Sequence, residues 1–174
     1  MEEGMSDDWY VVYTKRHQEL KLKEHFMSFS SDHSLKYESY LPLTSEVKIW
    51  SDRKKIKKVP LFNNYLFVKH DESGFNNIKK MPGFVEYVRF GQYPSVMPEK
   101  QIRMIKTILE ADSFATSKAS SLVTGERVRI IDGPMAGLEG ELIKDQFNLK
   151  VAIQVEYLER SLQVSVPINN ILKL

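Results

Sequence analysis

The chain has 174 residues, of which 42% are hydrophobic and 28% are charged, as in an ordinary globular protein of one or two domains. With 25 Lys and Arg against 23 Asp and Glu, the net charge of +2 indicates no particular class of partner. The sequence has no cysteine, which excludes disulfides, thiolate zinc sites and thiol nucleophiles.

The chain begins with an acidic stretch over residues 1–8, where a signal peptide would be basic and then apolar. No apolar run approaches the roughly 20 residues of a membrane span. We therefore expect a cytoplasmic protein without a membrane segment. Nothing in the sequence favours an obligate dimer, so a monomer is expected.

Residues 9–110 alternate between strand and helix patterns. Aromatic and β-branched residues favour strands, which we expect at 9–13, 37–43, 62–70 and 84–90. Apolar spacing predicts a helix from about Arg16 to Phe29 and another that starts after Pro98. On the first helix, five apolar residues fall on one arc: Leu20, Leu22, Phe26, Met27 and Phe29. Because no strict βαβ repeat is present, we expect an α+β domain.

A basic run lies between two short strand patterns at 47–50 and 57–59. The run includes Arg53, Lys54 and Lys55, and the whole segment resembles a hairpin with a basic tip. Such a tip is either a solvated turn or a binding site for nucleic acid. A second basic surface, on the first helix, favours the latter reading. Its members are Lys15, Arg16, His17, Lys21 and His25.

The charge and composition change along the chain. From Trp9 to Glu110 there are 18 Lys and Arg against 11 Asp and Glu, and from Ala111 onward there are 7 against 8. Between these parts, residues 111–121 are small and polar, which is typical of a linker. Residues 122–174 show period-two apolar alternation punctuated by glycines, which predicts a small all-β barrel.

No pattern of residues indicates an enzyme or a metal site. The four histidines form no ligand set, and no GxSxG surrounds a nucleophile. The segment Gly133–Gly140 resembles a phosphate-binding loop only in its glycines. It lacks the Lys-Ser/Thr pair that holds phosphate, and Glu139 would repel it. We therefore expect turns there, no catalytic residues, no cofactor and no metal.

The segment Tyr65-Leu66-Phe67-Val68 has two alternating faces. Leu66 and Val68 share one face, and Tyr65 and Phe67 share the other. The aromatic face either packs into the core or forms an exposed patch for a partner, which Tyr13 in the first strand would extend.

Two sets of residues together resemble the NusG family of transcription factors. Thr124–Gly140 is similar to the KOW motif that closes these proteins, and Trp9–Tyr13, Leu61–Val68 and Pro82–Val85 are similar to their N-terminal domain in order and spacing. The resemblance divides the chain into an N-terminal domain over 9–110, a linker over 111–121 and a KOW barrel over 122–174.

The details resemble specialised members of the family. Phe62-Asn63-Asn64-Tyr65 stands where the housekeeping proteins usually carry Phe-Pro-Gly-Tyr. Tyr13–Arg16 and Val88–Gly91 are similar to RfaH, and Trp50–Lys55 resembles the UpxY-type antiterminators of capsular polysaccharide operons.

The resemblance implies a binding protein that promotes processive, antiterminated elongation. It implies that Tyr13, Tyr65 and Phe67, supported by Phe62, dock on the clamp helices of the largest RNA polymerase subunit. It also implies that the first helix reads non-template DNA, with Lys15 and His25 at matching positions, and that the hairpin tip lies near upstream DNA.

For the KOW barrel, the resemblance implies recruitment of ribosomal protein S10 through Tyr157, Leu158 and Arg160. Leu158-Glu159-Arg160 replaces the Phe-Gly-Arg of the general factor, which argues against Rho binding. Two alternatives remain: a general housekeeping NusG-type factor, and a ribosome- or RNA-associated KOW protein. The latter would leave the Trp9 and Tyr65 motifs unexplained.

Overall fold

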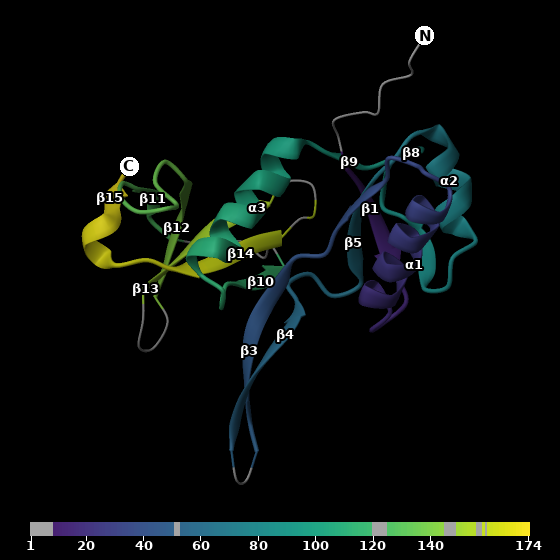
Figure 1. Cartoon of the computed structure of the whole chain (residues 1–174). Helices are drawn as coiled ribbons and strands as arrows, with labels where there is room; N and C mark the ends of the chain where they lie inside the picture. Colours follow the sequence, from purple (N-terminus) through teal and green to yellow (C-terminus); the bar gives the residue numbers. More distant parts are fainter. Residues whose placement is uncertain (1–8, 51–52, 120–124, 145–148, 156–157, 159) are drawn as a thin grey trace. The chain divides into compact units, whose positions relative to one another are not determined.

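The computed structural model describes residues 9–50, 53–119, 125–144, 149–155, 158 and 160–174 (Figure 1). The chain forms two compact units. The first combines the segment that ends at Leu41 with Phe62–Ile102, and the second combines Pro42–Leu61 with Arg103–Leu174.

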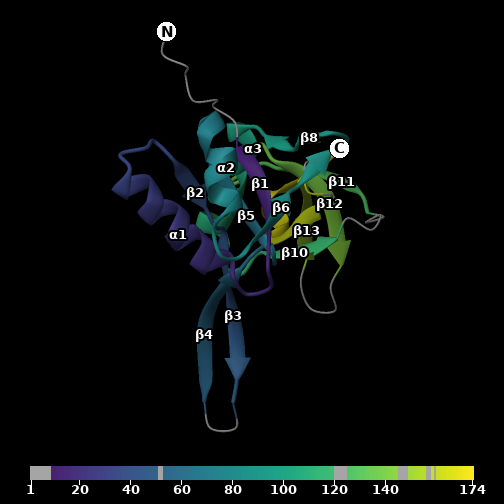
Figure 2. The ribbon, with the colours of Figure 1, turned by 90° about the vertical axis from the view of Figure 1, so that its right-hand side faces the viewer.

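The first unit is built on an antiparallel sheet of order β2-β5-β1-β6, with β9 also paired to β1. Its strands are β1 (Trp9–Thr14), β2 (Glu38–Tyr40), β5 (Tyr65–Lys69), β6 (Phe84–Tyr87) and β9 (Val96–Met97). Helices α1 (Glu19–Asp32) and α2 (Glu72–Lys79) also belong to this unit (Figure 2). The expectation of an α+β fold for this part of the chain is confirmed.

The core of the first unit lies between the two helices and one face of the sheet. Leu22 and Phe26 of α1 pack with Val12, Leu66 and Val68, all fully buried. Burying side chains of this size stabilises a fold by about 1.5–3 kcal/mol each. The predicted core positions Leu66 and Val68 are therefore confirmed.

The first helix differs from its prediction at both ends and on its surface. It begins at Glu19, because His17 has a φ of 59°, which lies outside the helical region. Its buried side chains recur at every third or fourth position. Leu20 and Met27, expected on the buried arc, are 55% and 37% exposed because they lie beside that stripe.

Helix α2 was not predicted from the sequence. Asp71 caps it, because its carboxylate accepts hydrogen bonds from the backbone N–H groups of Ser73 and Gly74. An aspartate at this position is a start signal for a helix. The sequence does not predict a helix here because Gly74 lies in the first turn, and glycine is a poor helix former.

Three predicted strands are shorter than expected. The segment 37–43 divides at Pro42, which lacks the N–H that a ladder needs, into β2 and the start of β3. The segment 62–70 begins as a strand only at Tyr65, after Asn64 with a φ of 70°. The segment 84–90 divides into β6 and β7 (Arg89–Phe90), and β7 pairs with β8 (Tyr93–Pro94).

The second unit contains the β3–β4 hairpin, most of α3 (Glu99–Ala111) and a six-stranded antiparallel sheet of order β10-β14-β13-β12-β11-β15. The hairpin pairs β3 (Leu43–Ile49) with β4 (Lys54–Pro60), as expected from the sequence. The sheet consists of β10 (Thr116–Ala119), β11 (Arg127–Ile130), β12 (Glu139–Lys144), β13 (Leu149–Val155), β14 (Arg160–Ser165) and β15 (Ile171–Lys173). The expected α3 helix and the alternating strands of this half are present.

The prediction of a linker over 111–121 is wrong for residues 116–119. These residues form β10, which pairs with β14 from Thr116↔Gln163 to Ala119↔Arg160. Asp112, which precedes β10, is also bonded to β14, because its carboxylate accepts a 3.0 Å hydrogen bond from the Ser165 backbone N–H. The composition predicts a linker because small polar side chains bury little apolar surface. The strand forms nevertheless, because its backbone pairs with that of β14.

The base of the hairpin is fixed within the second unit. The Thr44 hydroxyl shares its single proton between the carbonyl oxygens of Ala115 at 2.7 Å and Ser113 at 3.1 Å, and the Ser45 N–H donates to Ser113 O at 2.6 Å. Each such bond contributes about 0.5–1.5 kcal/mol net. These bonds explain why Pro42–Leu61 groups with the C-terminal part of the chain.

A buried histidine, His70, directly follows β5 in the first unit. His70 is 2% exposed, with Nδ1 at 2.6 Å from Asp71 O and Nε2 at 2.8 Å from the Tyr87 hydroxyl. Because a carbonyl only accepts, Nδ1 carries the proton and Nε2 accepts from Tyr87. The Tyr10 ring stacks on the imidazole at 5.0 Å. Burial lowers the pKa of His70 below 6.5, although the Asp71 carbonyl and carboxylate oppose this shift.

We predict that the free energy of unfolding falls as the pH drops from 7 to 5. The unfolded chain takes up a proton near pH 6.5, whereas folded His70 stays neutral to a lower pH, so the loss approaches about 1.4 kcal/mol per pH unit. Urea denaturation at several pH values measures it. Replacement of the exposed His17, His25 and His33 by Gln should retain this loss, and His70→Gln should abolish it. A loss that persists in His70→Gln would contradict the assignment.

Candidate functional site

The pairing of β1 with β5 decides which side chains share a face. The register joins Tyr10↔Val68, Val11↔Phe67, Val12↔Leu66 and Tyr13↔Tyr65. Since Val12, Leu66 and Val68 face the helices, alternation places Tyr13, Tyr65 and Phe67 on the opposite face.

The four aromatic residues expected to dock a partner differ in accessibility. Tyr13 is 37% exposed and Tyr65 is half-buried, and their rings meet edge to face at 5.6 Å. We call these two residues the tyrosine pair. Phe67 is fully buried against the rings of Tyr40 and Phe62, at 6.3 and 6.0 Å, and Phe62 is itself 1% exposed. The two phenylalanines therefore lie beneath the surface, and only the tyrosine pair is accessible.

The turn before Tyr65 fixes where the tyrosine pair lies. Asn64 has a φ of 70°, a left-handed conformation that suits Asn and Gly. Its backbone N–H donates to the Glu19 carboxylate at 2.8 Å, and its side-chain amide donates to Thr14 O at 3.1 Å. The Thr14 N–H donates in return to Asn64 O at 2.8 Å. The turn thereby links the end of β1, the start of α1 and the start of β5.

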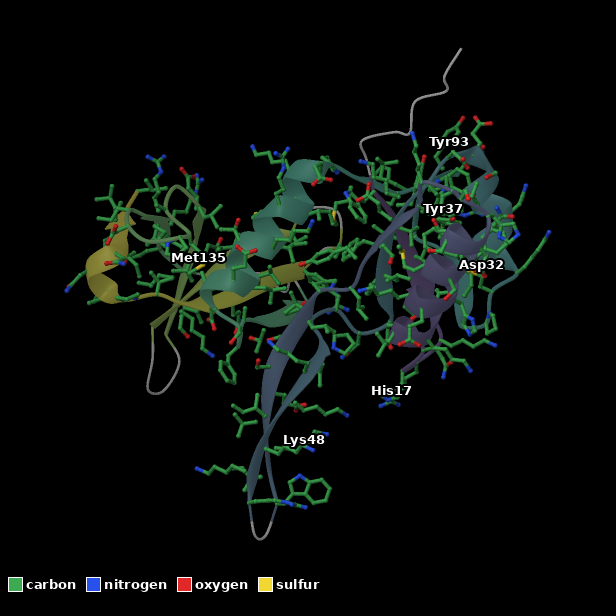
Figure 3. The ribbon with its side chains drawn as sticks, viewed as in Figure 1. His17, Asp32, Tyr37, Lys48, Tyr93 and Met135 are labelled. Carbon is green, nitrogen blue, oxygen red and sulfur yellow. The ribbon has the colours of Figure 1, made fainter. Side chains whose placement is uncertain are left out.

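The basic residues predicted on the first helix lie in two places. Lys15, Arg16 and His17 are exposed in the turn that precedes α1, and Figure 3 shows the His17 ring pointing away from the helix. Lys21 and His25 are exposed on α1 itself, one turn apart, and so share a face. The prediction that all five line the helix is therefore corrected.

The basic hairpin residues are exposed as predicted, but they belong to the second unit. Arg53 precedes β4, and Lys54 and Lys55 open it. From the sequence we expect these residues and the first helix on one domain. The structure assigns them to different units because the base of the hairpin is bonded to residues 113–115.

Of the three residues expected to bind a partner in the C-terminal half, Tyr157 lies outside the described residues. Leu158 and Arg160 are both half-buried, and Arg160 opens β14 opposite Val155. In the same sheet, Arg129 donates two hydrogen bonds to the Glu139 carboxylate and lowers its pKa. Gly137 has a φ of 89°, which supports the interpretation of Gly133–Gly140 as turns.

Two exposed aromatic side chains were not found by sequence reasoning. Phe90 and Tyr93 face each other across the β7–β8 pair and are 88% and 77% exposed. The sequence feature that could have predicted this hairpin is Gly91, whose φ of 65° permits the tight turn between the two residues. Within the described residues, no group of His, Asp and Glu can hold a metal, and no helix is long and apolar enough to cross a membrane.

Comparison with known proteins connects this arrangement to one family. The family model described as "Transcription termination factor nusG" matches residues 7–106. The transcription termination/antitermination protein NusG of Rickettsia felis is 27% identical over 157 residues, which cover 84% of this chain and 81% of that protein. NusG of Thermus thermophilus is 24% identical over 184 residues, which cover 97% and 100%.

A solved structure of NusG from Thermotoga maritima has a similar fold. It matches with a TM-score of 0.64 and 22% identity, and the match covers 96% of this chain and 97% of that one. The likeness therefore extends over both units of the chain.

We predict that Asn64→Ala destabilises the protein by about 2–3 kcal/mol. Alanine in the left-handed region costs about 1–2 kcal/mol, and the lost side-chain hydrogen bond adds about 1 kcal/mol. Asn64→Gly keeps the backbone conformation and should lose only about 1 kcal/mol. Chemical denaturation measures both, with the exposed neighbour Asn63→Ala as the control. Equal losses for Ala and Gly would show that the turn is not strained.

Proposed function

Because the chain belongs to the NusG family of transcription factors, whose members are not enzymes, we propose that it is an elongation factor that binds RNA polymerase. The family match over residues 7–106 carries this proposal, since it includes β1, β5 and the tyrosine pair. A ribosome-associated KOW protein would leave this half of the chain without a role.

The proposed docking surface is the tyrosine pair, and its occupant is the clamp-helix segment of the largest polymerase subunit. Tyrosine supplies a broad apolar ring and a polar tip, which suits the centre of a protein interface. The edge-to-face contact between Tyr13 and Tyr65 holds both rings in place before binding. Phe67 lies on the same face of β5 as Tyr65, and it is buried in contact with Phe62. The proposed polymerase contact thus consists of the two tyrosines, whereas the sequence predicted four aromatic residues.

The proposed nucleic-acid contacts are electrostatic. Lys15, Arg16 and His17 of the turn, with Lys21 and His25 of α1, are exposed and suit the phosphates of the non-template strand. Arg53, Lys54 and Lys55 are proposed to contact upstream DNA. Such contacts weaken with increasing salt because each releases counterions.

For the C-terminal half, we propose a KOW barrel that recruits ribosomal protein S10 through Tyr157, Leu158 and Arg160. The antiparallel strand order and the glycine turns support this proposal. Leu158 and Arg160 offer an apolar and a basic contact. The replacement of Phe-Gly-Arg by Leu158-Glu159-Arg160 argues against Rho as a partner.

We propose a specialised role on a limited set of long operons of the capsular polysaccharide type. The features in support are Asn63-Asn64 in place of Pro-Gly and the Trp50–Lys55 segment. A general housekeeping role fits the NusG relatives equally well. The two roles differ in the genomic distribution of the protein.

We predict that Tyr13→Ala with Tyr65→Ala reduces binding to purified RNA polymerase at least tenfold. Loss of two central aromatic contacts has this effect in protein interfaces. The melting temperature should fall by only a few degrees, since neither side chain is fully buried. Co-sedimentation and thermal unfolding measure the two quantities.

The matched control is Phe90→Ala with Tyr93→Ala. It also removes two exposed aromatic residues from the first unit, but from the β7–β8 pair. This variant should bind polymerase like the wild type. Normal binding by the folded Tyr13/Tyr65 variant, or equal loss in both variants, would contradict the assigned surface.

The specialised role predicts restricted occupancy in chromatin immunoprecipitation beside RNA polymerase in the native host. The tagged protein should occupy a few long operons, beginning in their leaders. Occupancy that follows polymerase over most genes would establish the general role instead. RNA polymerase in the same cells is the internal control.

A further inference from the structure

The β3–β4 hairpin has two chemically different faces. Seven residue pairs from Leu43↔Pro60 to Ile49↔Lys54 form the ladder, and the Trp50 N–H extends it with a 2.8 Å hydrogen bond to Arg53 O. Successive side chains alternate between the faces. The face that we call the tryptophan face carries Thr44, Glu46, Lys48, Trp50, Arg53, Lys55, Lys57 and Val59. The other, the isoleucine face, carries Leu43, Ser45, Val47, Ile49, Lys54, Ile56, Lys58 and Pro60.

Trp50 is exposed in a way that the fold does not require. The chain has two tryptophans. Trp9 is 3% exposed and its Nε1 donates to the Glu99 carboxylate, whereas Trp50 is 61% exposed. An exposed indole at the end of a ribbon contributes little to folding, but it offers an aromatic surface for stacking.

One pair of like charges on the tryptophan face opposes pairing of the hairpin strands. Lys48 lies directly opposite Lys55 in the register, and like charges at such positions are destabilising. Glu46 lies opposite Lys57, which leaves the Lys48–Lys55 pair without a facing carboxylate. Both lysines are exposed, and Figure 3 shows Lys48 extending away from the ribbon. A local conflict of this kind is expected at a functional site.

We propose that the tryptophan face binds single-stranded nucleic acid, with one base stacked on Trp50 and phosphates held by Lys48 and Lys55. The inference deepens the nucleic-acid part of the proposed function and rests on it. Aromatic side chains beside lysines bind single strands because every unpaired base has a free face for stacking. Bases within a duplex are already stacked on each other. The site therefore favours a single strand over a duplex.

The test uses the intrinsic fluorescence of the full chain. Trp50 is exposed and Trp9 is buried, so a base that stacks on the ribbon quenches only Trp50. Titration with a 15-nucleotide oligothymidylate should quench the emission, and oligouridylate of equal length compares RNA with DNA. A duplex of the same length should quench less. Trp9→Phe should retain the quenching.

Trp50→Leu should weaken binding about 5- to 150-fold, as expected for the loss of one stacked base; fluorescence anisotropy of a labelled oligonucleotide measures it. Lys48→Gln with Lys55→Gln should lower the salt dependence of log K by about 0.7 per lost phosphate contact. This double variant should melt no lower than the wild type, because it removes a repulsive pair. The charge-matched control is Lys79→Gln with Lys80→Gln, which removes two exposed lysines at the end of α2 in the first unit and should leave the affinity unchanged.

Four results would overturn the proposal: no binding of either oligonucleotide, unchanged affinity in Trp50→Leu, equal quenching by the duplex, or equal losses from the two lysine pairs. None of these experiments includes RNA polymerase. Failure here would therefore leave the tyrosine pair as the polymerase contact, whereas failure of the Tyr13/Tyr65 test would leave this site standing.

Discussion

The antiparallel register between β1 and β5 is the constraint on which the first unit depends. It places Val12, Leu66 and Val68 under the helices and leaves Tyr13 and Tyr65 on the other face. A shift of one residue would exchange the two sets, because side chains alternate along a strand. Tyrosine hydroxyls would then enter the core, and valine and leucine would meet solvent. The stability of the core and the position of the tyrosine pair are therefore set by the same four residue pairs.

The Asn64 turn holds that register. Its backbone and side chain bond to Thr14 and to the carboxylate of Glu19, which is 4% exposed. A carboxylate that buried is costly unless it is hydrogen-bonded, so the start of α1 and the start of β5 depend on each other. Asn64 adopts the left-handed conformation that glycine would otherwise supply. Asn64 thus supplies both the left-handed conformation and a side-chain hydrogen bond to Thr14 O.

The sequence predicted elements wherever periodicity was strong and failed where single backbone positions decide. β1, α3 and the β3–β4 hairpin follow from their apolar patterns. The late start of α1 depends on the φ of His17, which no composition rule anticipates. β10 exists because β14 offers it a partner, a tertiary effect that local propensity does not contain. At the candidate site, alternation placed Tyr13 beside Tyr65, but the burial of Phe67 depends on the rings of Tyr40 and Phe62, which arrive from other segments.

In the hairpin, the residues proposed to bind nucleic acid are separate from the residues that stabilise the fold. Its base is bonded through Thr44 and Ser45 to residues 113–115, and its length is held by the backbone ladder. The outer half supports no packed core, so it accepts a facing pair of lysines and an exposed tryptophan at little cost to the fold. Tyr13 and Tyr65 lack that freedom, because each lies on a strand whose neighbouring residues are fully buried. A change in the outer hairpin therefore alters what is bound without altering the fold, whereas a change at the fully buried Val12, Leu66 or Val68 destabilises the core beneath the tyrosine pair.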